Sequence, residues 1–357
     1  MHRYTVNLLR ELSTRPDIEL VLFTTTRELP YEEFLSGLDA RVVAVQASRE
    51  AWWGEWVLPR QLRRERIDVF HAPADRGVPL LSPCPTAVTV HDSYERSHWR
   101  TLFPSLKERM HYARWELANR RASAVITVSD TTRRTLVELG VAPDERLHRV
   151  YLAASPEFQP KRAPSDAHVL AKYDVRPPYV FYAGGYDSRK NVESLVEAFA
   201  RSGLENHMLV VAAAQLFRFP QLLADWRQLP GFARMRFVQP LPQELPALYR
   251  NAQLFVNPST WESFSLQLLE AMASGTPVLA SNRTAIPEIA GDAAIFFDPA
   301  DIDGLASLIT RAAADDELRA TLRARGFSRA RKFSWQQTAD ETLAIYRAIA
   351  RHASHAG

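Results

Sequence analysis

The sequence predicts an α/β protein with two tandem Rossmann-like domains, and three observations support this. The chain has 357 residues, which is long for one domain and comfortable for two. Short apolar, β-branched runs alternate with amphipathic segments in both halves of the chain. A stretch rich in proline and charge interrupts this alternation once. We therefore expect domains over residues 1–155 and 179–335, a linker over residues 156–178 and a terminal helix over residues 336–357.

The first half alternates strand-like runs with helical patterns such as residues 4–12 and 105–122. Several runs are apolar throughout, as expected for parallel strands that are covered on both faces. The predicted strands are residues 19–25, 41–47, 69–73, 86–92, 124–129 and 147–152. A doubly wound domain normally begins with a strand and a glycine-rich turn, whereas this chain opens in a helical pattern. The N-terminal domain is therefore expected to lack its first strand.

The second half restarts the alternation after the proline-rich stretch. Helical patterns cover residues 191–202, 245–252 and 264–274. The predicted strands are residues 179–185, 208–214, 235–240, 254–259, 277–282 and 294–299. In such sheets ligands bind at the carboxyl ends of the strands, so we expect a site in a cleft between the two domains.

The composition excludes several classes of protein. The net charge of +3 does not call for a nucleic-acid partner, and the pI near 9.0 is compatible with anionic ligands or surfaces. One cysteine, Cys84, permits no intramolecular disulfide and favours a reducing compartment. No run is long enough to span a membrane, and the N-terminus lacks the apolar core of a signal peptide. We expect a cytoplasmic protein, with peripheral contact with the inner face of the membrane left open.

The segment after the predicted strand 254–259 combines two glutamates with a helix signature. Glu262 lies in the loop at the strand's carboxyl end, and Ser263 and Ser265 are suitable N-caps for a helix that runs from Phe264. Its N-terminal N–H groups favour a phosphate. Glu270, further along, could accept hydrogen bonds from ribose hydroxyls. Spacing alone also allows both glutamates to be solvated surface residues.

The whole segment PSTWESFSLQLLEAMASGTPV (258–278) resembles the nucleotide-binding stretch of retaining glycosyltransferases of family four, in the bacterial mannosyltransferase-like group. Residues 281–301 continue the resemblance, which covers most of the chain. It implies the GT-B fold, a nucleoside-diphosphate sugar donor and a terminal helix that packs on the N-terminal domain. In this family the donor site would include Ser263, Phe264, Ser265, Leu266 and Glu270. Serines replace the family's glycines at 263 and 265, and serine can adopt fewer backbone conformations than glycine.

A second group of candidates follows the predicted strand 179–185. Gly184 and Gly185 would keep side chains away from a phosphate, and Arg189 and Lys190 would neutralise a diphosphate. Two solvated cations on a turn are the alternative. The segment resembles the family's phosphate clamp, in which Lys190 matches the family lysine. Gly185 stands where many members have an arginine, so Arg189 is expected to substitute.

In the N-terminal domain, His91 and Asp92 follow the predicted strand 86–92. The resemblance implies that His91 contacts the transferred sugar, while Asp92 is expected to orient the loop or the imidazole. His71 is interpreted as structural. Residues 51–67 combine tryptophans with arginines, which suits either a membrane-facing or acceptor surface or, as we favour, a helix with its tryptophans packed inward.

These observations predict a metal-independent enzyme. Asp301 and Asp303 have the spacing of a metal site, but Asp301 is interpreted as a helix N-cap and no metal is implied. The expected reaction moves a hexose from the donor, for which GDP-mannose is favoured, to a saccharide or lipid-linked saccharide during polysaccharide or glycolipid synthesis. Arg189 and Lys190 would stabilise the departing diphosphate. Glu262 would be a nucleophile or, as the resemblance favours, a ligand of sugar hydroxyls.

Two alternatives stay open. A non-catalytic nucleotide-sugar binding protein would fit the serines at 263 and 265 and the absence of the family's first strand and turn. A nucleotide-sugar epimerase shares the tandem architecture but not the glutamate segment. Because the family's first strand occupies the middle of its sheet, we expect a gap there. A start codon upstream of Met1 is the explanation that we favour over truncation.

Overall fold

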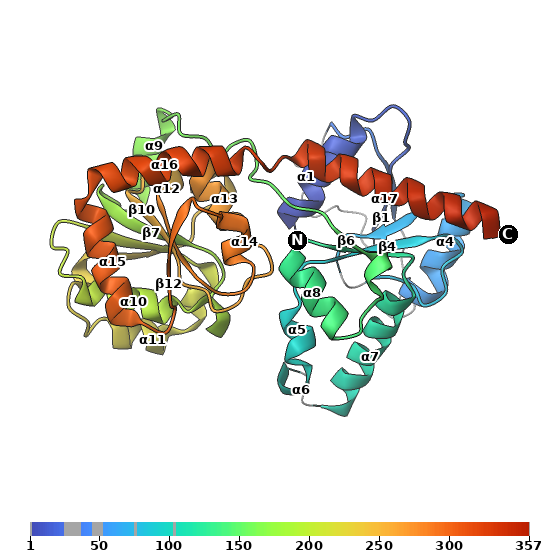
Figure 1. Ribbon diagram of the computed structural model, residues 1–357, viewed down its shortest axis with the longest axis horizontal. Helices are drawn as coiled ribbons and strands as arrows, with labels where there is room; N and C mark the ends of the chain where they lie inside the picture. The colour runs from blue at the N-terminus through green and yellow to red at the C-terminus, as the bar shows by residue number, and fades with distance from the viewer. Residues whose placement is uncertain (1, 25–36, 45–52, 75–76, 103–104, 357) are drawn as a thin grey trace. The chain divides into compact units, whose positions relative to one another are not determined.

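The computed structural model describes residues 2–24, 37–44, 53–74, 77–102 and 105–356 (Figure 1). The chain forms two compact units. One contains residues 1–152 together with 334–357, and the other contains residues 153–333. Each unit has parallel strands with helices packed on them.

The second unit contains one six-stranded sheet in which every paired strand is parallel. The spatial order is β12-β11-β10-β7-β8-β9. The strands are β7 (Tyr179–Ala183), β8 (Met208–Ala212), β9 (Met235–Val238), β10 (Leu254–Asn257), β11 (Val278–Ser281) and β12 (Ala294–Phe297). The chain runs outward from β7 to β9 and then returns to β10 on the other side of β7. The loops after β7 and β10 therefore diverge at a topological switch point, where such sheets bind ligands.

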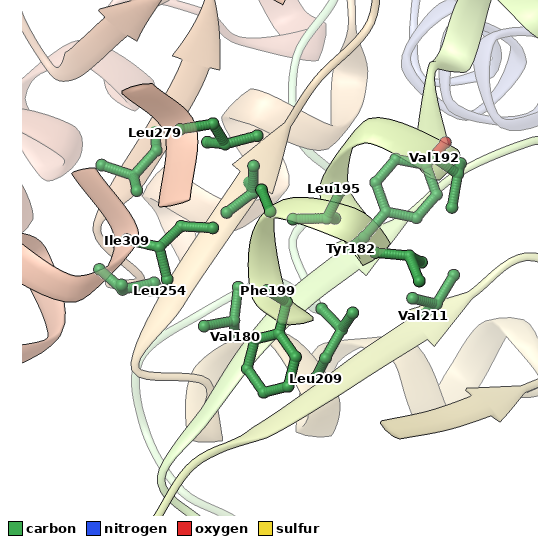
Figure 2. Close-up of a cluster of buried hydrophobic side chains, with 14 of the residues drawn as sticks. Val180, Tyr182, Val192, Leu195, Phe199, Leu209, Val211, Leu254, Leu279 and Ile309 are labelled. Atoms are coloured by element: carbon green, nitrogen blue, oxygen red, sulfur yellow. The ribbon is translucent and has the colours of Figure 1, made fainter. Parts of the chain in front are cut away.

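Buried aliphatic and aromatic side chains join this sheet to its helices. In α10 (Val192–Arg201), Val192, Leu195, Val196 and Phe199 are buried at helical spacing. All four belong to one core cluster, and Figure 2 shows Val192, Leu195 and Phe199 packed with side chains of the strands and with Ile309 of α15 (Ile302–Ala314). The other α-helices of this unit are α9 (Ser165–Lys172), α11 (Pro220–Trp226), α12 (Leu245–Asn251), α13 (Leu266–Ala273), α14 (Ile286–Ala290) and α16 (Asp316–Ala330).

Residues 156–178, expected from their composition to be a linker, lie in the second unit and contain α9. Asp166 on this helix forms a buried ion pair with Arg250 of α12, with N–O distances of 2.6 and 2.7 Å. Asn251 donates a further hydrogen bond to the same carboxylate at 3.0 Å. These contacts attach the proline-rich stretch to the sheet domain.

The first unit contains two parallel sheets. Four strands pair in the order β3-β4-β5-β6, and β1 pairs only with β2 among the described residues. The strands are β1 (Val21–Thr24), β2 (Arg41–Ala44), β3 (Phe70–Ala72), β4 (Thr86–Val90), β5 (Ala124–Thr127) and β6 (Leu147–Arg149). Both β1 and β3 line a cavity of about 970 Å³. The predicted gap in the sheet of this domain is therefore present in the part of the chain that the structure describes.

The terminal helix α17 (Trp335–Ala356) packs against α1 (His2–Ser13). Trp335 is buried, and its ring centroid lies 6.4 Å from that of Tyr4, so it anchors the start of this helix on α1. The remaining helices among the described residues of the unit are η1 (Trp53–Val57), α4 (Leu58–Arg64), α5 (Tyr94–Ser97), α6 (Trp99–Leu102), α7 (Leu106–Arg121), α8 (Asp130–Glu138) and η2 (Asp144–Arg146). Among the described residues, no helix is both long enough and apolar enough to cross a membrane.

The predicted tryptophan-rich helix is described only in part, because Trp52 lies outside the described residues. Leu58 and Leu62 supply the buried face of α4. Trp56 is 62% exposed, so the expectation that the tryptophans pack inward is wrong for this residue. Leucines at helical spacing already fill the inward face of the helix, which leaves Trp56 at the surface.

Candidate functional site

Two loops meet at the switch point of the second sheet. The loop after β7 contains Arg189 and the loop after β10 contains Thr260, whose backbone N–H donates to the carbonyl of Arg189 at 2.7 Å. Asn191, in the left-handed conformation with φ of 50°, donates from its side chain to the carbonyl of Pro258 at 3.2 Å. These bonds hold the predicted basic pair and the first predicted glutamate close together.

Lys190 and Glu262 form the centre of this cluster. The Lys190 Nζ lies 2.7 Å from Glu262 Oε1, and the two side chains are 13% and 10% exposed. Ser259 donates a hydrogen bond from its hydroxyl to the same carboxylate oxygen at 2.8 Å. A third loop, after β11, fixes the backbone of Glu262, because its N–H donates to Thr284 Oγ1 at 2.9 Å. The carboxylate is therefore oriented by residues from three strand ends.

Arg189 lies in the same loop, but a neighbouring acid neutralises part of its charge. Its Nε and Nη2 donate to the two carboxylate oxygens of Asp187 at 3.1 and 3.3 Å. The Arg189 side chain is 22% exposed. Of the two predicted cations, Lys190 is thus paired across the loops and Arg189 is paired within its own loop.

Of the two predicted glycines in this loop, only one lies where a side chain would not fit. A Cβ on Gly184 would lie 2.7 Å from the hydroxyl oxygen of Tyr182, which is closer than such contacts allow. That hydroxyl donates to the carbonyl of Gly185 at 2.8 Å, so it has little freedom to move. A Cβ on Gly185 would meet only Gln215 and Lys190, at 3.7 and 3.9 Å. Glycine is therefore needed for packing at 184 and not at 185.

The helix after the first glutamate begins later than predicted. Helix α13 starts at Leu266 rather than at Phe264, which is buried and packs edge-on against Phe333 at 6.2 Å between ring centroids. Ser265 is the N-cap residue, but its side chain makes no capping bond. Its φ of 69° is left-handed, and its hydroxyl accepts from Asn257 Nδ2 at 2.7 Å. The loop therefore keeps a glycine-like backbone at a serine.

Ser263 precedes this turn and is also buried. Together with Ser265, it places two small polar side chains in the stretch between Glu262 and the first turn of α13. Of the predicted donor residues, Ser263, Phe264 and Ser265 are buried in this loop, and Leu266, the first residue of α13, is partly buried.

Glu270 lies inside the second unit rather than on a solvated helix face. The residue is 2% exposed, and its Oε2 accepts a hydrogen bond from the hydroxyl of Tyr249 at 3.0 Å. Tyr249 is itself fixed, because its backbone carbonyl accepts from Thr276 Oγ1 at 2.6 Å. Helix α13 ends before Gly275, whose φ of 78° is the left-handed conformation that glycine commonly adopts after a helix.

In the first unit, His91 follows β4 as predicted. Its Nε2 lies 2.9 Å from the carbonyl of Pro73, and since a carbonyl only accepts, Nε2 carries the proton. Tyr4 contacts the imidazole edge-on, with ring centroids 4.6 Å apart. Asp92 accepts from the backbone N–H of Tyr94 at 2.8 Å, so it orients the loop.

His71 lies inside the fold of the first unit. Its Nε2 lies 2.8 Å from Thr89 Oγ1, and its Nδ1 is hydrogen-bonded to the hydroxyl of Tyr346. Burial, together with the nearby His91, lowers the pKa of His71 to about 3. A neutral imidazole with both nitrogens engaged agrees with the structural interpretation of this residue.

The acidic spacing at Asp301 also has a structural role. Asp301 Oδ1 accepts from the backbone N–H of Gly304 at 2.8 Å and caps α15, as the sequence predicted. In the described ranges, no group of three or more histidine, cysteine, aspartate or glutamate side chains is arranged to hold a metal ion.

Two known families match consecutive stretches of the chain. The family described as "Glycosyltransferase Family 4" matches residues 1–158, and "Glycosyl transferases group 1" matches residues 171–329. The MMP alpha-(1->4)-mannosyltransferase of Mycolicibacterium hassiacum is 30% identical over 96% of this chain and 82% of its own length. The chain belongs to glycosyltransferase family 4.

Another relative of this family 4 protein is the O-antigen chain mannosyltransferase B of Escherichia coli, 32% identical over 68% of the chain. That alignment spans 66% of the relative's length. The structure of Anabaena Alr3699/HepE in complex with UDP and glucose superposes with a TM-score of 0.78 at 18% identity, over 97% of this chain and 95% of that one. The predicted family and the predicted GT-B fold are confirmed.

Sequence reasoning missed three side chains of this family 4 site. Tyr249 holds Glu270, Ser259 holds Glu262, and Asn257 holds Ser265. A tyrosine in an amphipathic helix is indistinguishable by pattern from a core residue. Asn257 and Ser259, at the end of an apolar strand, could have been recognised as site residues. Buried polar side chains are nearly always hydrogen-bonded, so two of them at a strand end indicate polar partners nearby.

Proposed function

We propose that this protein is a retaining hexosyltransferase that moves mannose from GDP-mannose to an acceptor hydroxyl in polysaccharide or glycolipid synthesis. The names of its relatives, an O-antigen chain mannosyltransferase and a mannosyltransferase of Mycolicibacterium, support the choice of sugar. The observation that carries the proposal is the buried cluster of Lys190, Glu262 and Ser259 at the switch point of the second sheet.

The chemistry of this cluster suits a departing diphosphate. As the bond between sugar and phosphate breaks, negative charge grows on the phosphate oxygens, and a preorganised cation stabilises it. Lys190 supplies that cation at a position fixed by its ion pair with Glu262. Arg189 contributes less positive charge, because Asp187 partly neutralises it. In the proposed reaction these side chains provide the positive charge, and the enzyme needs no metal ion.

The two glutamates take separate roles in the proposal. Glu262, next to Lys190, accepts hydrogen bonds from hydroxyls of the transferred sugar. Glu270 keeps one carboxylate oxygen on Tyr249 and offers the other to the ribose. His91 of the first unit has a defined tautomer, with its proton on Nε2. The acceptor hydroxyl then attacks on the face from which the diphosphate leaves, and a phosphate oxygen receives its proton.

The acceptor is a saccharide or a lipid-linked saccharide, and the enzyme works in the cytoplasm at the inner face of the membrane. Supporting this, one relative named above is called an O-antigen chain mannosyltransferase.

Turnover of labelled donors tests the proposal. The purified chain is incubated with GDP-mannose, GDP-glucose, UDP-glucose or UDP-galactose, and released nucleoside diphosphate is measured with and without oligomannose acceptors. We expect release from GDP-mannose, and a loss of at least about 100-fold in Lys190→Ala, since preorganised charge contributes that much.

Lys172→Ala is the matched control, because Lys172 forms an ion pair with Glu244 at 2.6 Å on the surface of the same unit. Its activity should remain that of the wild type. Binding of a donor without any release of diphosphate would instead identify a non-catalytic binding protein, and equal release by Lys190→Ala would remove the cluster from the mechanism.

A further inference from the structure

Gln215 lies beside the loop that carries the predicted basic pair. It is the second residue of η4 (Ala214–Arg218), a short turn at the carboxyl end of β8. Strand β8 is the neighbour of β7 in the sheet, and the backbone N–H of Gly184 donates to the carbonyl of Ala212 at 3.1 Å. The loops after β7 and β8 therefore start side by side.

The structure fixes one end of the Gln215 carboxamide. Its Oε1 accepts a hydrogen bond from the backbone N–H of Tyr186 at 3.1 Å. Leu216, the next residue, is buried in the core of the second unit and anchors the turn. Tyr186 is held as well, because its hydroxyl donates to Glu193 and its ring centroid lies 5.0 Å from that of Phe219. The carboxamide oxygen of Gln215 thus has a defined position.

The other end of the carboxamide carries two N–H donors. Gln215 is exposed, and within the described ranges its side chain makes one hydrogen bond, the one to Tyr186. Because that bond uses the oxygen, both N–H groups of the amide remain available to a ligand. A donor that is already oriented before the ligand arrives loses little freedom on binding.

The position beside Gly185 brings this amide near Lys190. A Cβ on Gly185 would lie 3.7 Å from Gln215 Oε1 and 3.9 Å from Lys190 Cε, so both side chains border one point. The backbone at Gly185 is not left-handed and both distances are ordinary contacts, so a side chain would fit there. The sequence predicted that Arg189 substitutes for the family's arginine, but Arg189 donates to Asp187 from two nitrogens. The side chain that borders the position is that of Gln215.

We propose that Gln215 is a ligand of the donor's diphosphate, with an amide N–H that donates to a phosphate oxygen while Lys190 supplies the positive charge. This inference rests on the proposed function, because it adds a residue to the same diphosphate site. A neutral amide contributes less to anion binding than a guanidinium does, but it requires no counter-ion. This chain would therefore bind its donor with one lysine and one fixed amide.

Calorimetric titration of the full chain with GDP, guanosine, UDP and uridine tests the inference. We expect Gln215→Ala to weaken binding of the preferred nucleoside diphosphate by about three- to tenfold, with binding of its nucleoside unchanged. Gln215→Glu should weaken it by at least about tenfold more, because a carboxylate then faces the diphosphate. Glutamate retains an oxygen for the N–H of Tyr186, so a purely structural role of Gln215 would leave the diphosphate affinity of this variant unaltered.

An arginine at position 185 tests the position itself. In the Gln215→Ala background, Gly185→Arg should restore the diphosphate affinity to at least that of the wild type, because a guanidinium forms charge-assisted hydrogen bonds with phosphate. Circular dichroism verifies that each variant is folded. A folded double variant without this gain would show that position 185 does not border the diphosphate.

Gln228→Glu is the matched control, because it makes the same change of charge elsewhere in the second unit. Gln228 is exposed and lies between α11 and the amino end of β9, which is the opposite edge of the sheet. Its diphosphate affinity should equal that of the wild type. An equal loss in this control, an unaltered affinity in Gln215→Glu, or no gain from Gly185→Arg overturns the inference. Failure of the proposed function would look different, since the wild type itself would then bind neither diphosphate more tightly than its nucleoside.

Discussion

Breaking the ion pair between Lys190 and Glu262 should destabilise the second unit by a predictable amount. Lys190→Met keeps the aliphatic stem and removes the ammonium group, which leaves the Glu262 carboxylate with the Ser259 hydroxyl at 2.8 Å as its remaining partner in the cluster. Removing one member of a fully buried pair costs about 3–5 kcal/mol. The two side chains are 13% and 10% exposed, so some solvent reaches the charge and the lower end, about 3 kcal/mol, applies here.

The reverse change should be milder. Glu262→Gln leaves the Lys190 ammonium without its counter-charge, but a long side chain can move its end towards water, so we expect about 2 kcal/mol. The double variant contains no uncompensated buried charge and should lose about 2 kcal/mol, well below the sum of the two single losses. The resulting coupling energy is about 3 kcal/mol.

Urea unfolding followed by circular dichroism measures these free energies for the wild type and the three variants. For a domain of this size, a loss of about 3 kcal/mol should also lower the melting temperature by about 6–12 °C. Lys172→Met serves as the control, because the pair with Glu244 is on the surface and should contribute less than about 1 kcal/mol. Additive losses, with a coupling energy below about 0.5 kcal/mol, would refute the reasoning.

Three further predictions concern Tyr249, Gly184 and His71. Tyr249→Phe removes the hydroxyl bound to buried Glu270 and should cost about 1.5–3 kcal/mol of unfolding free energy, and weaken nucleotide binding, whereas an unchanged binding isotherm would contradict this role. Gly184→Ala should lower stability by about 1–3 kcal/mol because its Cβ meets the Tyr182 hydroxyl, and the added Tyr182→Phe change should recover part of the loss. Because the pKa of His71 is lowered to about 3, the unfolded state binds one more proton between about pH 3 and 6.5, so stability falls as the pH falls through that window. His71→Asn should reduce the slope of unfolding free energy against pH near pH 5 by about 1.4 kcal/mol per pH unit, and an unchanged slope would show that His71 titrates normally.

The secondary structure was largely readable from the sequence. Buried parallel strands appear as continuous apolar runs, and each predicted strand contains a strand of the structure, for example β7 within residues 179–185 and β10 within residues 254–259. The helix α9 was missed because its eight residues lie between prolines, and composition over a long window conceals so short a helix. Its attachment through Asp166 and Arg250 is a contact between residues 84 positions apart, which no local pattern shows.

The sequence predicted which residues belong to the site but not how they are arranged. Lys190 and Glu262 are 72 positions apart and meet because β7 and β10 are neighbours in the sheet. Their placement after two strands was visible, whereas the adjacency of those strands is a property of the whole sheet. At Ser265, local propensity predicts a side-chain N-cap, but the hydrogen bond from Asn257 holds the residue at a φ of 69° instead. A distant partner thus overrides a local preference.

The central claim is that the loops after β7 and β10 bind the diphosphate of a nucleotide-sugar. Isothermal titration calorimetry with GDP, GMP and guanosine, and with the matching uridine series, tests it most directly. We expect one nucleoside diphosphate to bind at least about tenfold more tightly than its nucleoside, and Lys190→Met to remove most of that difference while the nucleoside binds as before. Equal affinities of the wild type for GDP and guanosine and for UDP and uridine, or an unaltered diphosphate affinity in Lys190→Met, would contradict the claim.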